Sequence, residues 1–258
     1  MIAKSTNGGV SFSKPTLIAP ATLPGRLDPA HVAEKDPRWT MDGLAGARLD
    51  AGLSLDVANG APSGRDATDL MVAGWSDGSR GLNHERAMLT VSADRGNSWR
   101  TAGNAAVATD RPAYTAVAVS PNGTDAYVTY DAFLKPWRST TAQARPMQGV
   151  VRHADVSGGS LSSFATVHRG AAGDARGSSQ NGLTQGFLGD YNYVMATRTG
   201  ATAVWNDVRN AADCPAVDAY RASLVTAHKL PAPAPLKVCP ARFGNTDIYG
   251  GTYADPTP

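Results

Sequence analysis

Residues 92–99 read Ser92-Ala93-Asp94-Arg95-Gly96-Asn97-Ser98-Trp99, the pattern S-x-D-x-G-x-x-W, and they follow the strand-like run Ala87-Met88-Leu89-Thr90-Val91. An Asp carboxylate can accept hydrogen bonds from backbone N–H groups of its own turn, and a Gly can adopt the positive φ that a tight turn requires. The Trp can pack back over the loop. The stretch therefore predicts a hairpin turn whose structural positions are Ser92, Asp94, Gly96 and Trp99.

A second copy of this pattern stands near the start of the chain, at Ser5-Thr6-Asn7-Gly8-Gly9-Val10-Ser11-Phe12. Asn replaces the Asp and Phe replaces the Trp, and each replacement keeps the chemistry of its position. The corresponding structural positions are Ser5, Asn7, Gly9 and Phe12. Two copies of an eight-residue turn indicate a repeat architecture.

The composition favours strands and turns over helices. The chain has 258 residues with 27 Gly and 17 Pro, and Glu34 and Glu85 are its only glutamates. Gly, Pro and Asp favour turns, whereas helix surfaces use Glu and Lys. With 42% hydrophobic residues and a net charge of +2, the chain can bury a core and does not have the charge expected of a nucleic-acid-binding protein. The sequence contains no apolar run long enough for a membrane span.

Three repeats of the same strand pattern follow one another. The turn glycines Gly60, Gly123 and Gly200 mark equivalent places, and the second strand of each repeat ends in an aromatic residue followed by an acid. The expected strands are 53–58, 69–75 and 87–91, then 115–120, 125–131 and 149–154, and then 191–196, 201–207 and 217–224. A further strand is expected at 15–19. This matched order predicts an all-β fold, a β-propeller of four-stranded antiparallel blades, with about 3.5–4 blades present.

In this interpretation the chain is a single partial propeller. It divides into a blade tail at 1–20, a linker at 21–46 and blades at 47–108, 109–170 and 171–258. Residues 1–4 are too few to form the strand that should precede the first turn, and they do not form a signal peptide. We expect the chain to be the C-terminal part of a longer, exported protein, and the alternative is that Met1 is the true start.

The two cysteines, Cys214 and Cys239, are separated by a Pro-rich loop. Such a pair in a turn-rich, all-β chain suits a disulfide and an extracellular compartment. Closing this loop would stabilise the fold by about 3–4 kcal/mol in the chain-entropy model. The alternative is two unrelated buried thiols. The Cys spacing does not fit a zinc site, and the five His residues show no ligand spacing, so no metal site is expected.

The turn at residues 92–99 resembles the Asp-box, or BNR repeat, of sialidases and sialidase-like β-propellers, and the turn at residues 5–12 matches with two conservative departures. Gly189-Asp190-Tyr191 followed by Trp205-Asn206-Asp207-Val208-Arg209-Asn210 is similar to a blade of exported bacterial proteins labelled exo-α-sialidase-like. The resemblance implies a propeller, commonly six-bladed. It places the box on an outer turn, away from the central pocket. The box is therefore evidence for the fold, and its residues are not candidates for catalysis.

A sialidase of this family would use three Arg to bind the substrate carboxylate, a Tyr–Glu nucleophile pair and an Asp acid/base. The Arg-Ile-Pro motif that usually carries the first Arg does not occur here. The remaining catalytic candidates are Asp190, Tyr191, Arg209, Arg111, Arg48 and Glu85. The alternatives are surface Arg residues, a solvated Glu85, a turn-capping Asp190 and structural Tyr side chains. Trp137, as an exposed aromatic, and Tyr193 are the candidates for substrate binding.

Two functions follow from these observations. The first is a sialidase-like glycoside hydrolase, which needs clustered Arg and acidic residues at one mouth of the propeller. The second is a non-catalytic propeller that binds a glycan, a glycoprotein or another protein through its loops. The sequence lacks a G-x-S-x-G elbow, a P-loop and a G-x-G-x-x-G motif, so no cofactor is expected.

Overall fold

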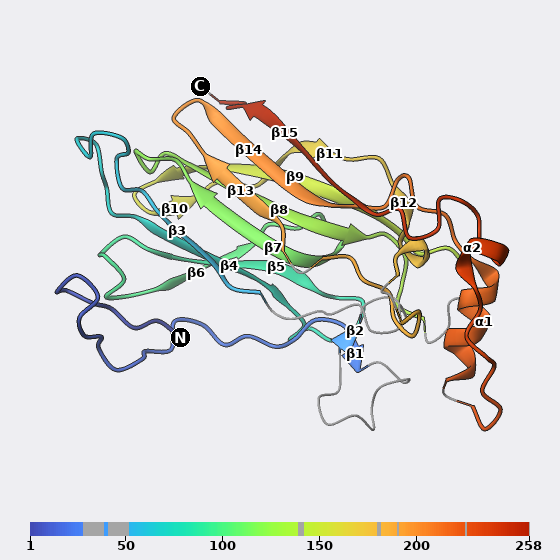
Figure 1. Cartoon of the computed structure of the whole chain (residues 1–258). Helices are drawn as coiled ribbons and strands as arrows, with labels where there is room; N and C mark the ends of the chain where they lie inside the picture. Colours follow the sequence, from blue (N-terminus) through green and yellow to red (C-terminus); the bar gives the residue numbers. More distant parts are fainter. Residues whose placement is uncertain are drawn as a thin grey trace.

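The computed structural model describes residues 1–27, 39–40, 52–138, 142–179, 182–189, 191–224 and 226–257. Three antiparallel sheets stack on one another, and the two short helices lie together at one end of the stack (Figure 1). The expected all-β fold of antiparallel sheets is confirmed, but only the first of the three sheets has the expected four strands, since the second has six and the third has three. Within the described residues, no helix has the length and apolar character needed to cross a lipid bilayer.

The first sheet has four strands in the order in which they occur along the chain. These strands are β3 (Ser54–Val57), β4 (Met71–Asp77), β5 (Arg86–Ser92) and β6 (Arg100–Asn104). A separate two-stranded ribbon pairs β1 (Arg26–Leu27) with β2 (Trp39–Thr40).

The second sheet lies in the middle of the stack. Its strands are β7 (Arg111–Val119), β8 (Asp125–Phe133), β9 (Pro146–Ser157), β10 (Ser160–Leu161), β11 (Ala165–Arg169) and β12 (Gly173–Asp174). The long strand β9 pairs with β8 on one side and with β10, β11 and β12 on the other. A 3₁₀ turn, η1 (Ala175–Gly177), follows this sheet.

The third sheet has three strands, β13 (Tyr193–Ala196), β14 (Gly200–Asp207) and β15 (Asp247–Ala254). The chain between β14 and β15 forms α1 (Pro215–Ser223) and α2 (Pro235–Val238). A disulfide joins Cys214, directly before α1, to Cys239, directly after α2, as the sequence predicts. It therefore links the two helices of this excursion.

The middle sheet is covered on both faces, and all nine residues of β8 are buried. Side chains alternate between the faces of a strand, so each strand of this sheet contributes to two cores. On β7, Val117 and Val119 pack against the first sheet, whereas Ala116 and Ala118 pack against the third. Trp205, on β14, fills the core between the second and third sheets.

Two expected strands are not formed. Residues 217–223 lie in helix α1 and Leu224 caps its end, so they do not form a strand, and β15 supplies the third strand of the last sheet. Pro215 suits the first turn of a helix, and the buried residues Val217 and Arg221 are four positions apart, which places them on one helical face. Residues 15–19 contribute a single bridge, between Ile2 and Thr16.

The two turns quoted from the sequence use matching hydrogen bonds. Ser92 Oγ accepts from Gly96 N–H at 2.8 Å, and Asp94 Oδ1 accepts from Ser98 N–H at 2.8 Å. In the first copy, Ser5 Oγ accepts from Gly9 N–H at 2.8 Å and Asn7 Oδ1 accepts from Ser11 N–H at 3.0 Å. Hydrogen bonds from Ser98 and Ser92 lower the pKa of Asp94.

The aromatic positions of the two turns differ. Trp99 is half-buried, whereas the Phe12 side chain is 65% exposed and does not pack back over its loop. The amino-terminal segment instead contacts the second turn through Lys4 Nζ, which donates to Asn97 Oδ1.

The Trp205→Ala substitution tests the packing between the second and third sheets. The ring lies so close to Gly149 that a Cβ there would meet Trp205 Cδ1 at 2.0 Å. We expect the free energy of unfolding to fall by about 3–5 kcal/mol, because removing a large buried ring leaves a cavity. Urea denaturation measures this change. The control is Ile248→Ala at an exposed position of β15, which should change stability by no more than about 0.5 kcal/mol. Equal effects of the two substitutions would contradict the packing described here.

Candidate functional site

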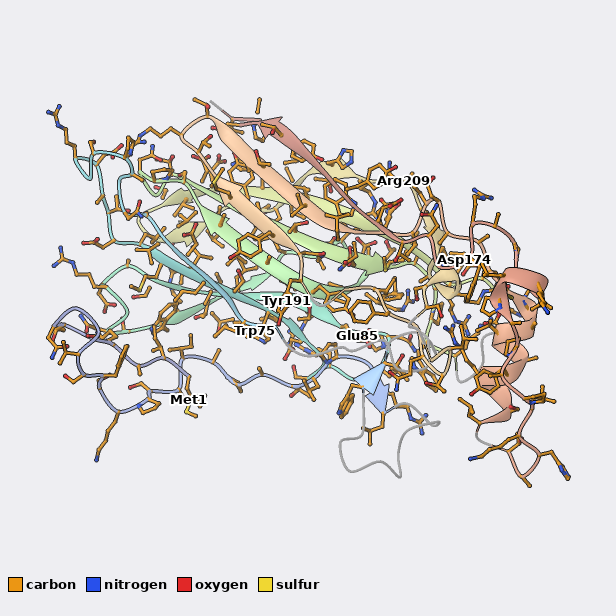
Figure 2. All side chains as sticks on the ribbon, in the orientation of Figure 1. Met1, Trp75, Glu85, Asp174, Tyr191 and Arg209 are labelled. Atoms are coloured by element: carbon orange, nitrogen blue, oxygen red, sulfur yellow. A yellow bond between two sulfur atoms is a disulfide. The ribbon has the colours of Figure 1, made fainter. Side chains whose placement is uncertain are left out.

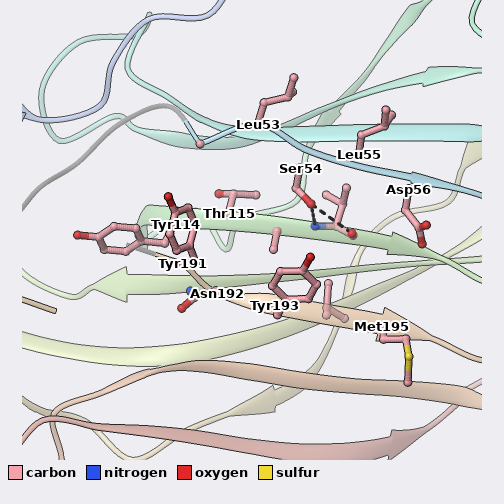
Figure 3. A pocket seen from close by; sticks show the side chains of 14 residues that line it. Leu53, Ser54, Leu55, Asp56, Tyr114, Thr115, Tyr191, Asn192, Tyr193 and Met195 are labelled. Carbon is pink, nitrogen blue, oxygen red and sulfur yellow. Dashed lines mark hydrogen bonds between the residues drawn. The ribbon is translucent and has the colours of Figure 1, made fainter. Parts of the chain in front are cut away.

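An open groove of about 700 Å³ runs between the first strands of the three sheets, β3, β7 and β13 (Figure 3). Its lining consists of residues 52–56, 114–117 and 191–195. Side-chain hydrogen bonds hold β3 against β7, although the two strands belong to different sheets. Ser54 Oγ accepts from Val117 N–H at 3.1 Å, and Asp56 Oδ2 accepts from Val119 N–H at 2.9 Å.

The groove is lined by three Tyr rings, neutral polar groups and aliphatic side chains. Tyr114 and Tyr191 lie at the end where β7 begins, and Tyr193 follows along β13 (Figure 3). Tyr191 and Tyr193 are 79% and 72% exposed, so their rings are accessible to a ligand. Among the described residues of the lining, Asp56 is the only charged one, and it lies at the opposite end.

Tyr114 owes its position to an irregularity in β7. The pairing register with β8 shifts between Ala113 and Ala116, and Tyr114 adopts a left-handed conformation with φ of 53°. A β-bulge redirects side chains and is common next to functional sites, and a bulky residue at positive φ is strained. The bulge places Tyr114 in the lining of the groove, in a local conformation that a regular strand would not adopt.

Each sheet has a buried acid in the last part of its second strand. Asp77 and Asp207 end their strands and pair with Arg86 at 2.8 Å and with Arg209 at 2.7 Å. Asp131 lies two residues before the end of β8, and it instead accepts a hydrogen bond from Asn206 Nδ2 at 3.2 Å. Three similar sequence positions therefore have different electrostatic environments.

Asp131 is connected to the groove through two amides. Asn206 Nδ2 also donates to Asn192 Oδ1 at 3.2 Å, and Asn192 lines the groove. Burial raises the pKa of Asp131 well above its usual range, the amides of Asn206 and Asn192 lower it, and the neighbouring Asp207 raises it. The net effect favours the protonated carboxyl, a neutral group that can donate a hydrogen bond.

Glu85, Arg111 and Trp137 are site residues predicted from the sequence, and they meet around Asn83, which was not predicted. Asn83 N–H donates to Glu85 Oε1 at 3.0 Å, and Asn83 Oδ1 accepts from Arg111 Nε at 3.3 Å and from the Trp137 backbone N–H at 2.6 Å. We call Asn83, Glu85, Arg111 and Trp137 the Asn83 cluster. Asn83 adopts a positive φ of 70°, a conformation that Asn tolerates better than most residues.

A second cavity, of about 370 Å³, lies beside this cluster and is lined in part by Glu85, Arg86 and Asp110. Glu85 is buried and not solvated, and its Oε2 has no hydrogen-bond partner among the described residues. Asp110 is held by two hydrogen bonds of 2.9 Å from Arg169. Trp137, expected as an exposed aromatic, is half-buried beneath the Arg26 guanidinium, which lies 5.3 Å from its ring centroid.

The other site residues predicted from the sequence do not lie in the Asn83 cluster. Arg209 binds Asp207 and lies 3.9 Å from the ring centroid of Tyr249, and Figure 2 shows it apart from Tyr191. Arg111 and Arg209 are both absent from the described lining of the groove. Arg48 and Asp190 lie outside the described residues. The described part of the chain therefore brings no group of arginines to the groove.

Sequence reasoning overlooked Tyr114, Asp131, Asn83 and Asn192. Asp131 had a signal, because it belongs to the repeated aromatic-then-acid ending of the second strand. Tyr114 had no signal in the sequence, because the register shift that positions it depends on how β7 pairs with β8. Within the described residues, one group of side chains is arranged like metal ligands, and it lies away from both cavities at Asp125, His153 and Asp155.

No protein-family model and no curated protein sequence matches the chain. Among solved structures, it is similar to the α-L-arabinofuranosidase Arb93A of Fusarium graminearum, with 10% identity and a TM-score of 0.37 over 62% of this chain and 41% of that one. It is similar to the α-L-arabinanase of Penicillium chrysogenum, with 14% identity and a TM-score of 0.35 over 62% of this chain and 42% of that one.

A third similar structure is Trypanosoma rangeli sialidase, with 12% identity and a TM-score of 0.30 over 75% of this chain and 34% of that one. The chain thus spans less than half the length of each of these three proteins. At these TM-scores the similarities carry no argument about activity.

The Asp131→Asn substitution tests the protonation of the buried acid. Because the folded-state pKa of Asp131 is raised, the folded protein binds a proton that the unfolded chain releases near its ordinary pKa of about 4. The free energy of unfolding of the wild type should therefore fall as the pH rises from about 4 through the folded-state pKa. In Asp131→Asn this fall should be smaller, and stability at neutral pH should not decrease.

Urea denaturation between about pH 4 and 8 measures this dependence. The matched control is Asp207→Asn, which removes the partner of Arg209 and should lower stability at neutral pH. A loss of stability in Asp131→Asn as large as that in the control would show that Asp131 is ionised in the folded protein.

Proposed function

We propose that this protein binds glycans through the groove between β3, β7 and β13. The observation that carries the proposal is the lining itself, in which the exposed rings of Tyr191 and Tyr193 lie on either side of the amide residue Asn192, among aliphatic side chains. Sugar rings present apolar C–H faces that pack on aromatic rings and hydroxyls that pair with amides and hydroxyls. Tyr191 and Tyr193 would supply the stacking surfaces, and Asn192 and Thr115 the polar contacts.

The charge of the lining favours a neutral glycan. Recognition of a carboxylate, such as that of a sialic acid, relies on Arg, whose planar guanidinium forms paired hydrogen bonds with it. The described lining contains no Arg or Lys, and its one acid, Asp56, would repel an anion. Neutral oligosaccharides are therefore the proposed ligands, and the groove acts as a binding site and not as a sialidase centre.

Hydrolysis is the second candidate function, and the cavity beside the Asn83 cluster favours it. Glu85 and Asp110 line one cavity, and glycoside hydrolases act with pairs of carboxyl groups. Glu85 has an oxygen without a hydrogen-bond partner among the described residues, whereas Asp110 is bound by Arg169. Of the two, Glu85 is therefore the group available for a reaction.

Export of the protein belongs to the same proposal. The disulfide between Cys214 and Cys239 supports it, because disulfides persist in oxidising compartments outside the cytosol. A glycan-binding groove is also of use to a protein that meets cell-wall or extracellular polysaccharide.

Glycan binding can be tested on an array of neutral and sialylated oligosaccharides, followed by calorimetric titration with the best ligand. Tyr191→Ala and Tyr193→Ala should each weaken binding about tenfold, a loss of about 1.4 kcal/mol. Ile248→Ala is the matched control, because Ile248 is an exposed apolar residue of the same sheet that does not line the groove.

This control distinguishes two explanations for the exposure of Tyr191 and Tyr193, namely a ligand-binding groove and a sheet face that is exposed as a whole. The uncovered face of the last sheet also exposes Val204 and Ile248, which do not line the groove, so exposure alone does not define a binding site. Equal losses of affinity in Ile248→Ala and Tyr191→Ala would point to the sheet face and not to the groove. Binding to none of the glycans would contradict the proposal.

Hydrolysis can be tested with fluorogenic arabinofuranosides and sialosides. If the side cavity is catalytic, Glu85→Gln should lower kcat at least about 100-fold, because the reaction needs the carboxyl group. Asp56→Asn is the control, since Asp56 belongs to the groove and not to the side cavity. Activity that survives in Glu85→Gln would exclude Glu85 from catalysis, and inactivity of the folded wild type would leave binding as the function.

A further inference from the structure

A cluster of acids around a buried histidine lies where the second and third sheets meet, away from the groove. The antiparallel register of β8 and β9 pairs Asp125 with Asp155 and Tyr127 with His153. Residues two apart on a strand face the same side, so these four side chains share one face of the second sheet. Asp255, directly after β15, reaches the cluster from the third sheet.

The ligand atoms of this cluster converge. His153 Nε2 lies 3.0 Å from Asp125 Oδ1 and 3.7 Å from Asp255 Oδ1. One ligand atom each from Asp125, His153 and Asp155 lies within 4.8 Å of the others. Tetrahedral ligands at about 2.0–2.2 Å from one metal ion are about 3.3–3.6 Å apart, which lies between the two distances from His153 Nε2. His153 and Asp125 are buried, whereas Asp155 is exposed and leaves the cluster open to solvent.

The charges of the cluster are not balanced by a basic side chain in the described part of the chain. Asp125 and Asp255 have ion-pair contacts with His153, and none of the three acids has one with an Arg or a Lys there. Asp125 and Asp155 stand directly opposite each other, and like charges at such a cross-strand pair are destabilising. A bound cation would remove this repulsion.

Tyr127 provides an independent observation. Its side chain is fully buried, its hydroxyl has no hydrogen-bond partner among the described residues, and its ring centroid lies 4.9 Å from that of His153. A buried hydroxyl without a partner is costly, and this one belongs to the ring that packs against His153.

We propose that Asp125, His153 and Asp155 form a binding site for a divalent transition-metal cation, with Zn²⁺ as the best match and Asp255 as a neighbouring acid that contacts the ligand His153. Imidazole nitrogen and carboxylate oxygens are common zinc ligands, and these three leave the fourth tetrahedral position open to solvent. Ca²⁺ fits less well because it takes six to eight oxygen ligands. The Tyr127 hydroxyl would lie next to the ion and donate to a ligating carboxylate.

The site joins parts of the chain that are distant in sequence. Asp255 follows the last strand of the third sheet, and Thr257 Oγ1 donates to Asp155 Oδ1 of the second. A metal ion bound to His153 and Asp155 would stabilise the two residues through which the end of β15 contacts the β8–β9 pair. Its role is structural, and it does not depend on the function of the groove.

The test uses tag-free protein, stripped with a chelator and dialysed, in calorimetric titrations with Zn²⁺ and with Ca²⁺ for comparison. We expect one Zn²⁺ per chain and, at about a hundredfold excess over Kd, a rise in Tm of about 5–10 °C. Asp155→Asn and Asp255→Asn should each weaken Zn²⁺ binding at least about tenfold. Both positions are at or near the surface, so the variants should fold.

The matched control is Asp69→Asn, an exposed acid that pairs with Arg95 and lies outside the cluster. It should bind Zn²⁺ as the wild type does. Failure of the wild type to bind Zn²⁺ would overturn the proposal. So would unchanged affinity in both Asp155→Asn and Asp255→Asn, because the ion would then be bound elsewhere, for example at another histidine.

Discussion

The structure depends on burying the middle sheet on both faces. The strands of that sheet must pack against the first and the third sheet at once, because their side chains alternate between the two faces. Strand β7 does this by using Val toward the first sheet and Ala toward the third. The small side chains allow close approach of the third sheet, and Trp205 fills the space that remains. The groove exists because the first strands of the three sheets are held side by side by this stacking.

The same stacking gives similar sequence positions different chemistry. The second strand of each sheet carries a buried acid near its end, and burial of a charge is costly without a partner. Asp77 and Asp207 have arginines, whereas Asp131 has amides from the neighbouring sheet. The repeated sequence pattern therefore places an acid in each strand, and the packed neighbours decide which groups bind it.

Cross-strand register explains why the candidate sites were only partly visible in the sequence. Asp125 and His153 are 28 positions apart, yet β8 and β9 bring them into contact. The spacing of the histidines consequently showed no metal signal. In the same way, Glu85, Arg111 and Trp137 meet only through Asn83. Tyr191 and Tyr193 were identified as candidates because they begin a strand, and that strand lines the groove.

The sequence by itself determined the features that depend on local chemistry. The Ser-x-Asp-x-Gly turns, the strands with alternating apolar residues and the antiparallel blades follow from bonds and periodicities within a few residues. Only the tertiary structure decided that residues 215–223 form a helix and that β15 completes the last sheet. It also decided the burial that raises the pKa of Asp131 and the convergence of acids on His153. These features depend on which segments pack together, and a short stretch of sequence does not contain that information.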